Sequence, residues 1–267
     1  LGAPMVGNTA VAAMVEHHAA LYADLADPVA LLRREGRPAM AGYWPYAAAP
    51  TASAGDGPSA ASLSPERVAE YSALMSASQP LITREVLGAY RFDRHRVLLD
   101  VGGGEGSFIA AVARQAPDLR LMLFDLPAVA ERARQRLTSA GLAARTSIHG
   151  GDFFNDELPR GADIVSLVRV AFDHSDDKVL RLLKAVRRAL PDTGTVLLAE
   201  PLSKVPGVEA MGDAYFGFYL LAMGRGRPRS AAQLSALLQS AGFAPAMTVP
   251  THMPLQTGLL VARCGPA

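Results

Sequence analysis

The fold of this chain is decided by the stretch Leu99-Asp100-Val101-Gly102-Gly103-Gly104-Glu105-Gly106-Ser107. A short apolar run leads into a glycine turn, and a helix is expected to begin at about Ser107. Glycine allows positive φ and lets a ligand come close to the backbone, and a helix N-terminus favours an anionic group. The stretch therefore predicts a strand, a ligand-binding turn and a helix. Dinucleotide-binding folds use a similar loop, so the loop alone leaves the ligand open.

Short apolar runs and amphipathic stretches alternate from Arg96 onward. The runs that predict strands are 97–101, 119–124, 146–149, 164–170 and 196–199. Strands that alternate with helices predict a parallel sheet with both faces covered. A helical stretch that ends at Gly242 is followed by two more runs, 246–252 and 258–263, which a proline-containing turn joins. These last runs predict an antiparallel pair of strands at the end of the chain.

Two acidic residues follow predicted strands. Asp125 stands in Leu-Phe-Asp-Leu-Pro over 123–127, where its carboxylate can accept both hydroxyls of a ribose. Asp152 stands before Phe153, so the acid can accept from an adenine amino group and the ring can cover the base. The plainer alternatives are a helix cap at Asp125 and an ordinary turn with a buried ring at 150–154. Together with the glycine loop, the acids predict a ligand that contains adenosine.

The composition excludes several classes of function. The 267 residues are 50% hydrophobic, which suffices for one sizeable core, and the net charge of +1 gives no nucleic-acid footprint. Cys264 is the only cysteine, and the six histidines show no metal-ligand spacing, so we expect no metal and a reducing, cytoplasmic location. No run of about 18 apolar residues is present, so we expect no membrane span.

Four blocks together resemble the plant-type and bacterial small-molecule O-methyltransferases. They are Asp100-Val101-Gly102-Gly103-Gly104-Glu105-Gly106, Phe124-Asp125-Leu126-Pro127, Gly150-Gly151-Asp152-Phe153-Phe154 and Ala199-Glu200-Pro201. The resemblance covers roughly residues 65 to 264. It implies an α/β, Rossmann-like class I methyltransferase domain over 93–267, with a mostly parallel seven-stranded sheet and a terminal antiparallel pair. An N-terminal helical segment over 1–92 would cover the acceptor.

The resemblance implies S-adenosylmethionine as the methyl donor and S-adenosylhomocysteine as the product. The glycine loop and the helix that follows it would hold the methionine carboxylate. The residues that the resemblance places at the donor are Asp100, Gly102, Gly104, Asp125, Leu126, Gly151, Asp152, Phe153 and Arg169.

Three stretches resemble more narrowly the O-methyltransferases of acyclic carotenoids, of the hydroxyneurosporene or demethylspheroidene type. They are 17–28, 166–170 and 212–229. This resemblance implies a hydroxylated, hydrophobic acceptor. Met211 to Met223 is apolar nearly all round, which predicts a helix buried on every side. The residues expected to line the acceptor are Phe172, Tyr215, Phe216, Tyr219 and Met223, and plain core or a dimer interface is the alternative.

The arginines between Gly224 and Arg229 follow this predicted helix directly. They are either solvated or near lipid headgroups, which would give a peripheral membrane contact. We favour solvated arginines.

The general base is the chemical question that the sequence raises. Many relatives have a histidine just before Asp-Trp in the loop after the fourth strand, and Phe172 stands at that position here. His174 is the first substitute, because imidazole titrates near neutrality, and packing against the sheet is the alternative. Asp213 is the second substitute, with a helix cap as its alternative. A third option is that water takes the proton late.

Several rival functions stay open at this stage. They are C-methylation of a bacteriochlorophyll-type pigment, a silent S-adenosylmethionine-binding interaction module and, more distantly, a hydride-transferring dehydrogenase. Family members usually carry an N-terminal winged-helix domain that builds the dimer, and it is missing here. We therefore expect a homodimer only where that domain is present.

Overall fold

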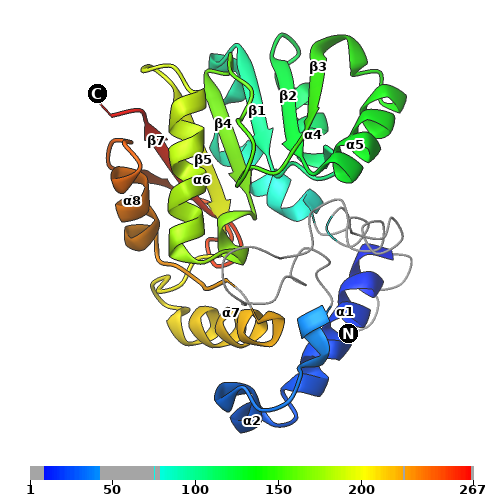
Figure 1. Cartoon of the computed structure of the whole chain (residues 1–267), viewed down its shortest axis with the longest axis vertical. Coiled ribbons are helices and arrows are strands. Elements are labelled where there is room, and N and C mark those ends of the chain that lie inside the picture. Colours follow the sequence, from blue (N-terminus) through cyan, green and yellow to red (C-terminus); the bar gives the residue numbers. More distant parts are fainter. Residues whose placement is uncertain (1–8, 43–74, 76–78, 225, 266–267) are drawn as a thin grey trace.

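A seven-stranded sheet forms the centre of the computed structural model, which describes residues 9–42, 75, 79–224 and 226–265. The strand order is β3-β2-β1-β4-β5-β7-β6 (Figure 1). The strands are β1 (Val97–Val101), β2 (Arg120–Asp125), β3 (Thr146–Gly150), β4 (Ile164–Val168), β5 (Thr195–Glu200), β6 (Met247–Val249) and β7 (Gly258–Arg263). The first five run parallel and β7 is antiparallel to β5 and β6, which confirms the predicted fold class.

Helices cover both faces of the sheet. Successive side chains of a strand point to opposite faces, so neighbouring residues belong to different apolar clusters. Leu98 lies in one apolar cluster with Phe108, and its neighbour Leu99 lies in the other with Leu183. The first face carries α4 (Ser107–Gln115), α5 (Pro127–Ser139) and the helix over 79–89. The second face carries α6 (Asp176–Ala189) and α8 (Ala231–Ser240).

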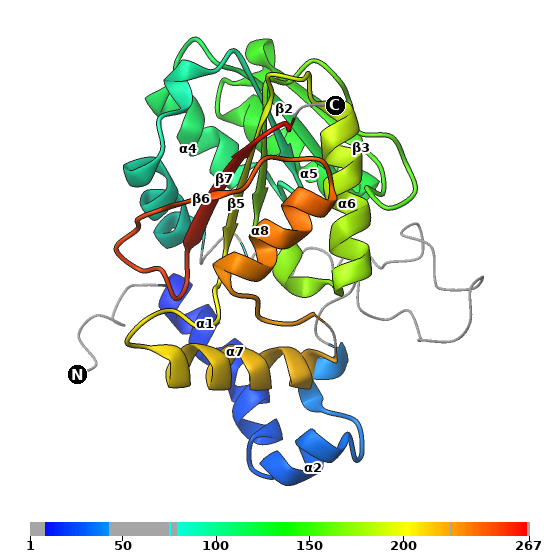
Figure 2. The ribbon, with the colours of Figure 1, turned by 90° about the vertical axis from the view of Figure 1, so that its left-hand side faces the viewer.

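The N-terminal helices pack away from the sheet, against α7 (Glu209–Met223). They are α1 (Thr9–Asp24) and α2 (Pro28–Arg33), followed by a 3-10 turn over Ala39–Gly42 (Figure 2). This small core joins Leu21, Leu31 and Met40 to Ala222 and Met223.

The helix over 79–89 belongs to the sheet instead, through Ile82 and Val86. The segment 1–92 is thus divided between two packing environments, and a domain boundary at residue 92 stays a prediction. Much of the second half of this predicted helical segment, residues 43–74 and 76–78, falls outside the described residues.

The prediction that α7 is buried on every side is wrong. Tyr215 is 37% exposed, and Asp213 and Ala214 are also exposed. The helix lies beyond the carboxyl edge of the sheet and not between two layers (Figures 1 and 2). Since α1 and α2 cover only part of its circumference, the apolar sequence leaves an exposed side.

Replacing Leu198 in β5 by alanine is expected to lower the free energy of unfolding by about 2–5 kcal/mol, because a buried leucine leaves a cavity. Leu198 is fully buried, whereas Leu81 in the helix over 79–89 is 54% exposed. Leu81→Ala is the matched control and should change stability by no more than about 0.5 kcal/mol. Urea unfolding followed by circular dichroism measures both, and equal losses would contradict the assignment of the core.

Candidate functional site

Strand register gathers the sequence motifs at one edge of the sheet. Asp100 of β1 pairs with Leu123 of β2, and Asp125 of β2 pairs with Gly150 of β3, so the carboxyl ends of these strands are neighbours. The order of the strands reverses between β1 and β4, and in open α/β sheets ligands bind outside the carboxyl ends at such a point. The loops meet there, since the Gly151 amide donates to the Asp125 carbonyl at 2.9 Å.

The glycine loop needs its glycines for two different reasons. Gly102, Gly104 and Gly106 have φ values of +69°, +57° and +78°, which side chains rarely adopt. A Cβ on Gly103 would lie 2.7 Å from Oδ2 of Asp100, so that position also lacks room. At Gly104 a Cβ would meet no described atom within 4 Å. The loop therefore leaves backbone at Gly104 open to an approaching ligand.

Asp100 is a buried acid with an unsatisfied oxygen. Its side chain is 1% exposed, and the Ser166 hydroxyl donates to Oδ1 at 2.5 Å. Its Oδ2 has no hydrogen-bond partner among the described residues. Burial raises the pKa of Asp100 to about 7; the Ser166 hydrogen bond opposes this rise and the charge of Asp125 adds to it. A buried acceptor in this state favours a cationic or hydrogen-bond-donating ligand.

Asp125 lies beside this acid and accepts from the backbone of both flanking loops. The Gly104 amide donates to Oδ2 at 2.8 Å and the Leu126 amide to Oδ1 at 2.7 Å. Burial raises the pKa of Asp125 to about 6, although both amides lower it. Its carboxylate is thus fixed at the junction of the glycine loop and β2, where the ribose role was predicted.

Asp152 and Phe153 follow β3 as predicted, in a compact turn. The carboxylate of Asp152 accepts from the Phe154 amide at 2.9 Å and from the Asn155 side chain at 2.7 Å. A Cβ on Gly151 would lie 2.6 Å from the ring of Phe124, so only glycine fits before this turn. The Asp152 carboxylate thus stabilises its own turn. A role for Asp152 at an adenine amino group would use the carboxylate lone pairs that these hydrogen bonds leave.

The loop after β4 is held by Glu200, whose position the sequence left without a role. Its carboxylate accepts from the amides of Val170, Ala171 and Phe172 at 3.0, 2.8 and 3.2 Å. Burial raises the pKa of Glu200 to about 7 against these three hydrogen bonds. Arg169, at the start of the loop, has a φ of +59°, a strained value for a residue with a side chain. Such strain persists only where the surroundings fix the backbone.

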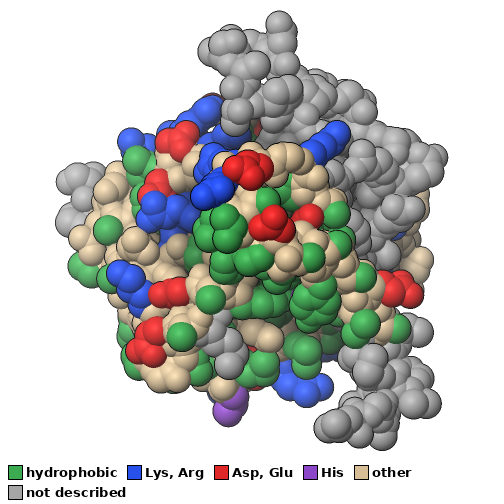
Figure 3. All heavy atoms as spheres, turned by 90° about the horizontal axis from the view of Figure 1, so that it is seen from below, with side chains coloured by type: hydrophobic (Ala, Val, Ile, Leu, Met, Phe, Trp, Pro, Cys, Tyr) green, Lys and Arg blue, Asp and Glu red, His purple; other side chains and the backbone are tan. Residues whose placement is uncertain are grey.

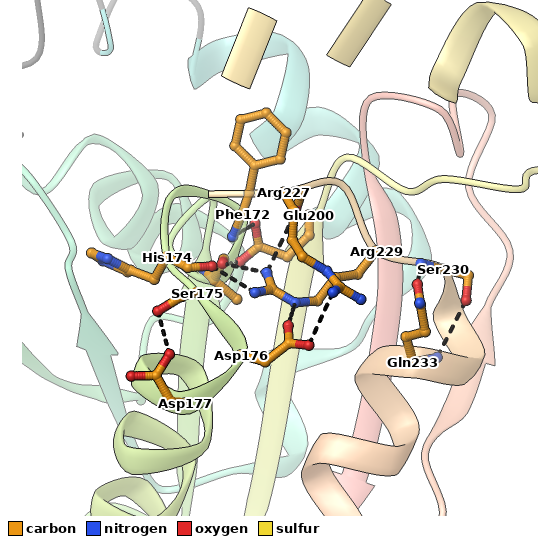
Figure 4. A network of polar contacts seen from close by, with 11 residues as sticks. Phe172, His174, Ser175, Asp176, Asp177, Glu200, Arg227, Arg229, Ser230 and Gln233 are labelled. Atoms are coloured by element: carbon orange, nitrogen blue, oxygen red, sulfur yellow. Dashed lines mark hydrogen bonds and ion pairs between the residues drawn. The ribbon is translucent and has the colours of Figure 1, made fainter. Parts of the chain in front are cut away.

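Arg229 holds the same loop from the other side (Figure 4). It is 2% exposed and donates to the Ala171 carbonyl at 2.8 Å and to the His174 carbonyl. Its Nε also pairs with Asp176 at 2.7 Å. The expectation that the arginines of this turn are solvated is therefore wrong for Arg229, because unpaired backbone carbonyls draw it inward.

His174 and Phe172 point in different directions from this loop (Figure 4). The imidazole of His174 packs edge-on against Phe154, with ring centroids 4.9 Å apart, and against Phe153 at 5.8 Å. The ring of Phe172 packs edge-on against the ring of Phe216 in α7, with centroids 5.6 Å apart. His174 thus stands with Phe153, the ring predicted to cover the adenine, and with its neighbour Phe154, and not with the acceptor residues. A role for His174 as a base stays a prediction.

Asp213 lies on the exposed side of α7. Its Oδ1 accepts from the Lys204 amide at 2.9 Å, which steadies the loop before the helix at a residue with a φ of +55°. This contact is not the helix cap considered as the alternative, because α7 begins at Glu209 and its N-cap residue is Val208. A role as a base stays a prediction here too.

The residues expected to line the acceptor divide into two groups. Tyr215, Phe216 and Tyr219 form one aromatic cluster with Phe172, and Tyr219 stacks on Phe172 at 6.4 Å. Met223 is 5% exposed and belongs to the small core beneath α1 and α2. The cluster, but not Met223, adjoins the loop that follows β4.

The described ranges contain neither a metal-binding cluster nor a membrane-spanning helix. No group of three or more His, Cys, Asp or Glu side chains is arranged to hold a metal ion. No helix combines the length and apolar character of a membrane span.

The Rossmann-like sheet, its glycine loop and the neighbouring acids Asp100 and Asp125 together define a class I methyltransferase architecture. The chain belongs to the O-methyltransferase domain family, whose sequence profile matches residues 22–244.

Curated relatives share this architecture at substantial identity. The chain is 46% identical over 261 residues to demethylspheroidene O-methyltransferase from Cereibacter sphaeroides, covering 98% of this chain and 66% of the relative. It is 38% identical over 268 residues to the enzyme of the same name from Rhodobacter capsulatus, covering 99% and 63%. The chain thus spans just under two thirds of the length of these relatives. Aclacinomycin 10-hydroxylase from Streptomyces purpurascens is 34% identical and covers 86% of this chain and 58% of its own.

Solved structures agree with the fold. Mitomycin 7-O-methyltransferase superposes with a TM-score of 0.68 at 30% identity, covering 75% of this chain and 58% of its own. An O-methyltransferase of neocarzinostatin biosynthesis, solved with S-adenosylmethionine and 2-hydroxy-5-methyl naphthoic acid, gives a TM-score of 0.66 at 27% identity over 75% of this chain and 58% of its own.

Asp100→Asn is expected to flatten the dependence of stability on pH. The pKa of Asp100 lies at about 7 in the folded protein, against 3.8 ordinarily, so the folded state holds a proton that the unfolded chain releases. Its stabilising contribution is present below about pH 4 and is lost as the pH rises to about 7. Urea unfolding between pH 4 and 8 should show a smaller loss for Asp100→Asn than for wild type. The exposed Asp118→Asn variant should keep the wild-type slope, and parallel curves for all three proteins would contradict the shift.

Proposed function

We propose that this chain transfers a methyl group from S-adenosylmethionine to a hydroxyl of a hydrophobic small molecule, of the hydroxylated acyclic carotenoid class. The observation that carries the proposal is the acid pair Asp100 and Asp125 beside the open backbone of Gly104. Two relatives named demethylspheroidene O-methyltransferases, matched over nearly the whole chain, support the acceptor class.

The protein groups at the carboxyl edge of the sheet fit S-adenosylmethionine. Its ammonium group is a cation that donates hydrogen bonds, which suits the unsatisfied Oδ2 of Asp100. Asp125 and the adjoining Leu126 would hold the ribose, and Asp152 and Phe153 the adenine. Gly102, Gly104, Gly151 and Arg169 supply the rest of the cradle. The structures of related enzymes solved with S-adenosylmethionine and, at 25% identity, with S-adenosylhomocysteine support the same ligand.

The chain's contribution to the chemistry is alignment and the exclusion of water. S-adenosylmethionine supplies a methyl group on a positively charged sulfur, which an oxygen nucleophile displaces in line. The loop over 170–172 is fixed by Glu200 and Arg229, so Phe172 presents its ring at a defined place. Phe172, Phe216 and Tyr219 offer apolar faces to a polyene acceptor and keep water away.

The rivals receive less support. The family includes a relative named as a hydroxylase, so membership alone does not fix the reaction. The two relatives that match nearly the whole chain, at 46% and 38% identity, are named O-methyltransferases, which favours transfer to oxygen over transfer to carbon. The same two names are those of enzymes, which favours a working transferase over a silent module that only binds S-adenosylmethionine.

A hydrophobic acceptor also suits the surface at this end of the molecule. Val15, Tyr22, Val29 and Leu32 of α1 and α2 are between 51% and 64% exposed. Figure 3, which views the molecule from this end, shows hydrophobic side chains over much of the described surface. We extend the proposal to peripheral contact with a membrane that supplies the acceptor; a homodimer is proposed only for a chain that carries the additional N-terminal domain.

Asp125→Ala is expected to weaken binding of S-adenosylmethionine about 10- to 100-fold, because a charged acceptor of the ribose is lost. Isothermal titration calorimetry at pH 8 measures the change. Asp118→Ala is the control, since Asp118 is an exposed acid in the turn before β2. NAD should not bind to either protein. Unchanged affinity in Asp125→Ala would remove this residue from the donor site.

Incubation with methyl-labelled S-adenosylmethionine should place label in demethylspheroidene held in detergent micelles. The methyl ether of the same carotenoid is the matched control and should take none, because it lacks the hydroxyl. Label in the ether would point to methylation of carbon. Tight donor binding without label in any hydroxylated acceptor would favour the silent module.

A further inference from the structure

Two histidine–tyrosine pairs join α1 to α7. Nε2 of His17 lies 2.9 Å from the Tyr219 hydroxyl, and Nε2 of His18 contacts the Tyr215 hydroxyl. The pairs differ in depth, since His17 is 4% exposed whereas Tyr215 is 37% exposed. The inner pair, His17 and Tyr219, therefore places two polar groups inside a largely apolar junction.

The inner pair adjoins the position at which many relatives carry their general base. Tyr219 stacks on Phe172, which occupies that place, with ring centroids 6.4 Å apart. Phe216 closes the same side at 5.6 Å from Phe172. Arg169, at the end of β4, is near enough for its charge to act on His17. The pair thus lies between the N-terminal helix and the loop that borders the donor site.

We propose that Tyr219, positioned by His17, receives the proton of the acceptor hydroxyl during methyl transfer. This inference rests on the proposed function. As the acceptor oxygen bonds to the methyl carbon, the carbon–sulfur bond of the methyl donor breaks and its electron pair stays on sulfur. The electrons of the acceptor O–H bond stay on oxygen, and the proton moves to the Tyr219 hydroxyl. The Tyr219 proton passes to Nε2 of His17, which later releases it to water. Before reaction, the acceptor hydroxyl donates to the Tyr219 oxygen, which leaves an oxygen lone pair for the methyl group.

The protonation state of His17 suits this role. Burial, together with the charges of His18 on the same helix and of Arg169, lowers the pKa of His17 to about 4. The group of α7 that faces His17 is the hydroxyl of Tyr219. His17 is therefore neutral at pH 7, and its Nε2 can accept from Tyr219 when the ring proton is on Nδ1. A forming oxonium is a much stronger acid than an imidazolium, so a weak base suffices once the new C–O bond forms.

Tyr219→Phe and His17→Gln test the inference, with His18→Gln as the matched control in the same helix. In the demethylspheroidene assay, kcat should fall about 100-fold in the first two variants. S-adenosylmethionine affinity should stay within about twofold of wild type in all three, because the pair does not contact the acids. His18→Gln should keep the wild-type kcat. The kcat of wild type should persist to pH 5, well below the ordinary histidine pKa, because deprotonated His17 is the active form.

A binding measurement separates this inference from the proposed function. Wild type should bind demethylspheroidene about 5- to 10-fold more tightly than its methyl ether, and Tyr219→Phe should bind the two equally. Thermal melting checks that Tyr219→Phe, which loses one oxygen atom, stays folded. Wild-type kcat and preference in Tyr219→Phe, or an equal fall in His18→Gln, would overturn the inference. If wild type itself transfers no methyl group, the proposed function fails and the alcohol-over-ether preference still decides the role of Tyr219.

Discussion

Two neighbouring carboxylates lie at the ends of the adjacent strands β1 and β2: that of Asp100 is buried and that of Asp125 is half-buried. Burial and the neighbouring charge of Asp125 make Asp100 harder to ionise, burial does the same to Asp125, and the backbone amides of Gly104 and Leu126 satisfy only Asp125. A protein keeps such an arrangement where a ligand completes it. The sheet order, the glycine turn and the short loops after β2 and β3 all position groups around this acid pair, and the proposed ligand, a cationic nucleoside, would complete it.

The second half of the site depends on a loop that is fixed from two sides. Glu200 accepts hydrogen bonds from the backbone amides of the loop, and Arg229 donates to two of its carbonyls. These polar groups are therefore already hydrogen-bonded within the protein. What the loop presents outward is the ring of Phe172 on one side and the imidazole of His174 on the other. The donor edge is therefore polar and acidic, the acceptor edge is aromatic, and the pair His17–Tyr219 is the polar exception in the acceptor edge.

Much of the fold could be predicted from the sequence because local signals decided it. The glycine loop, the two acids after strands and the alternating apolar runs each have a local physical cause, and the strand bounds agree to within a few residues. The burial of α7 was mispredicted, because an apolar circumference says nothing about how much of it α1 and α2 cover. Arg229 and Glu200 could not be recognised, since their roles arise from carbonyls and amides that lie 28 to 58 residues away in the chain. The contact between His17 and Tyr219 spans 202 residues, and no local pattern marks it.

The most direct test of the account is a crystal structure of this chain soaked with S-adenosylhomocysteine. The account predicts the amino acid part of the ligand over Gly104 with its ammonium at Asp100, the ribose hydroxyls at Asp125 and the purine beside Phe153. Density for the ligand at any other place, or a ribose that does not contact Asp125, would contradict the claim that the acid pair forms the donor site.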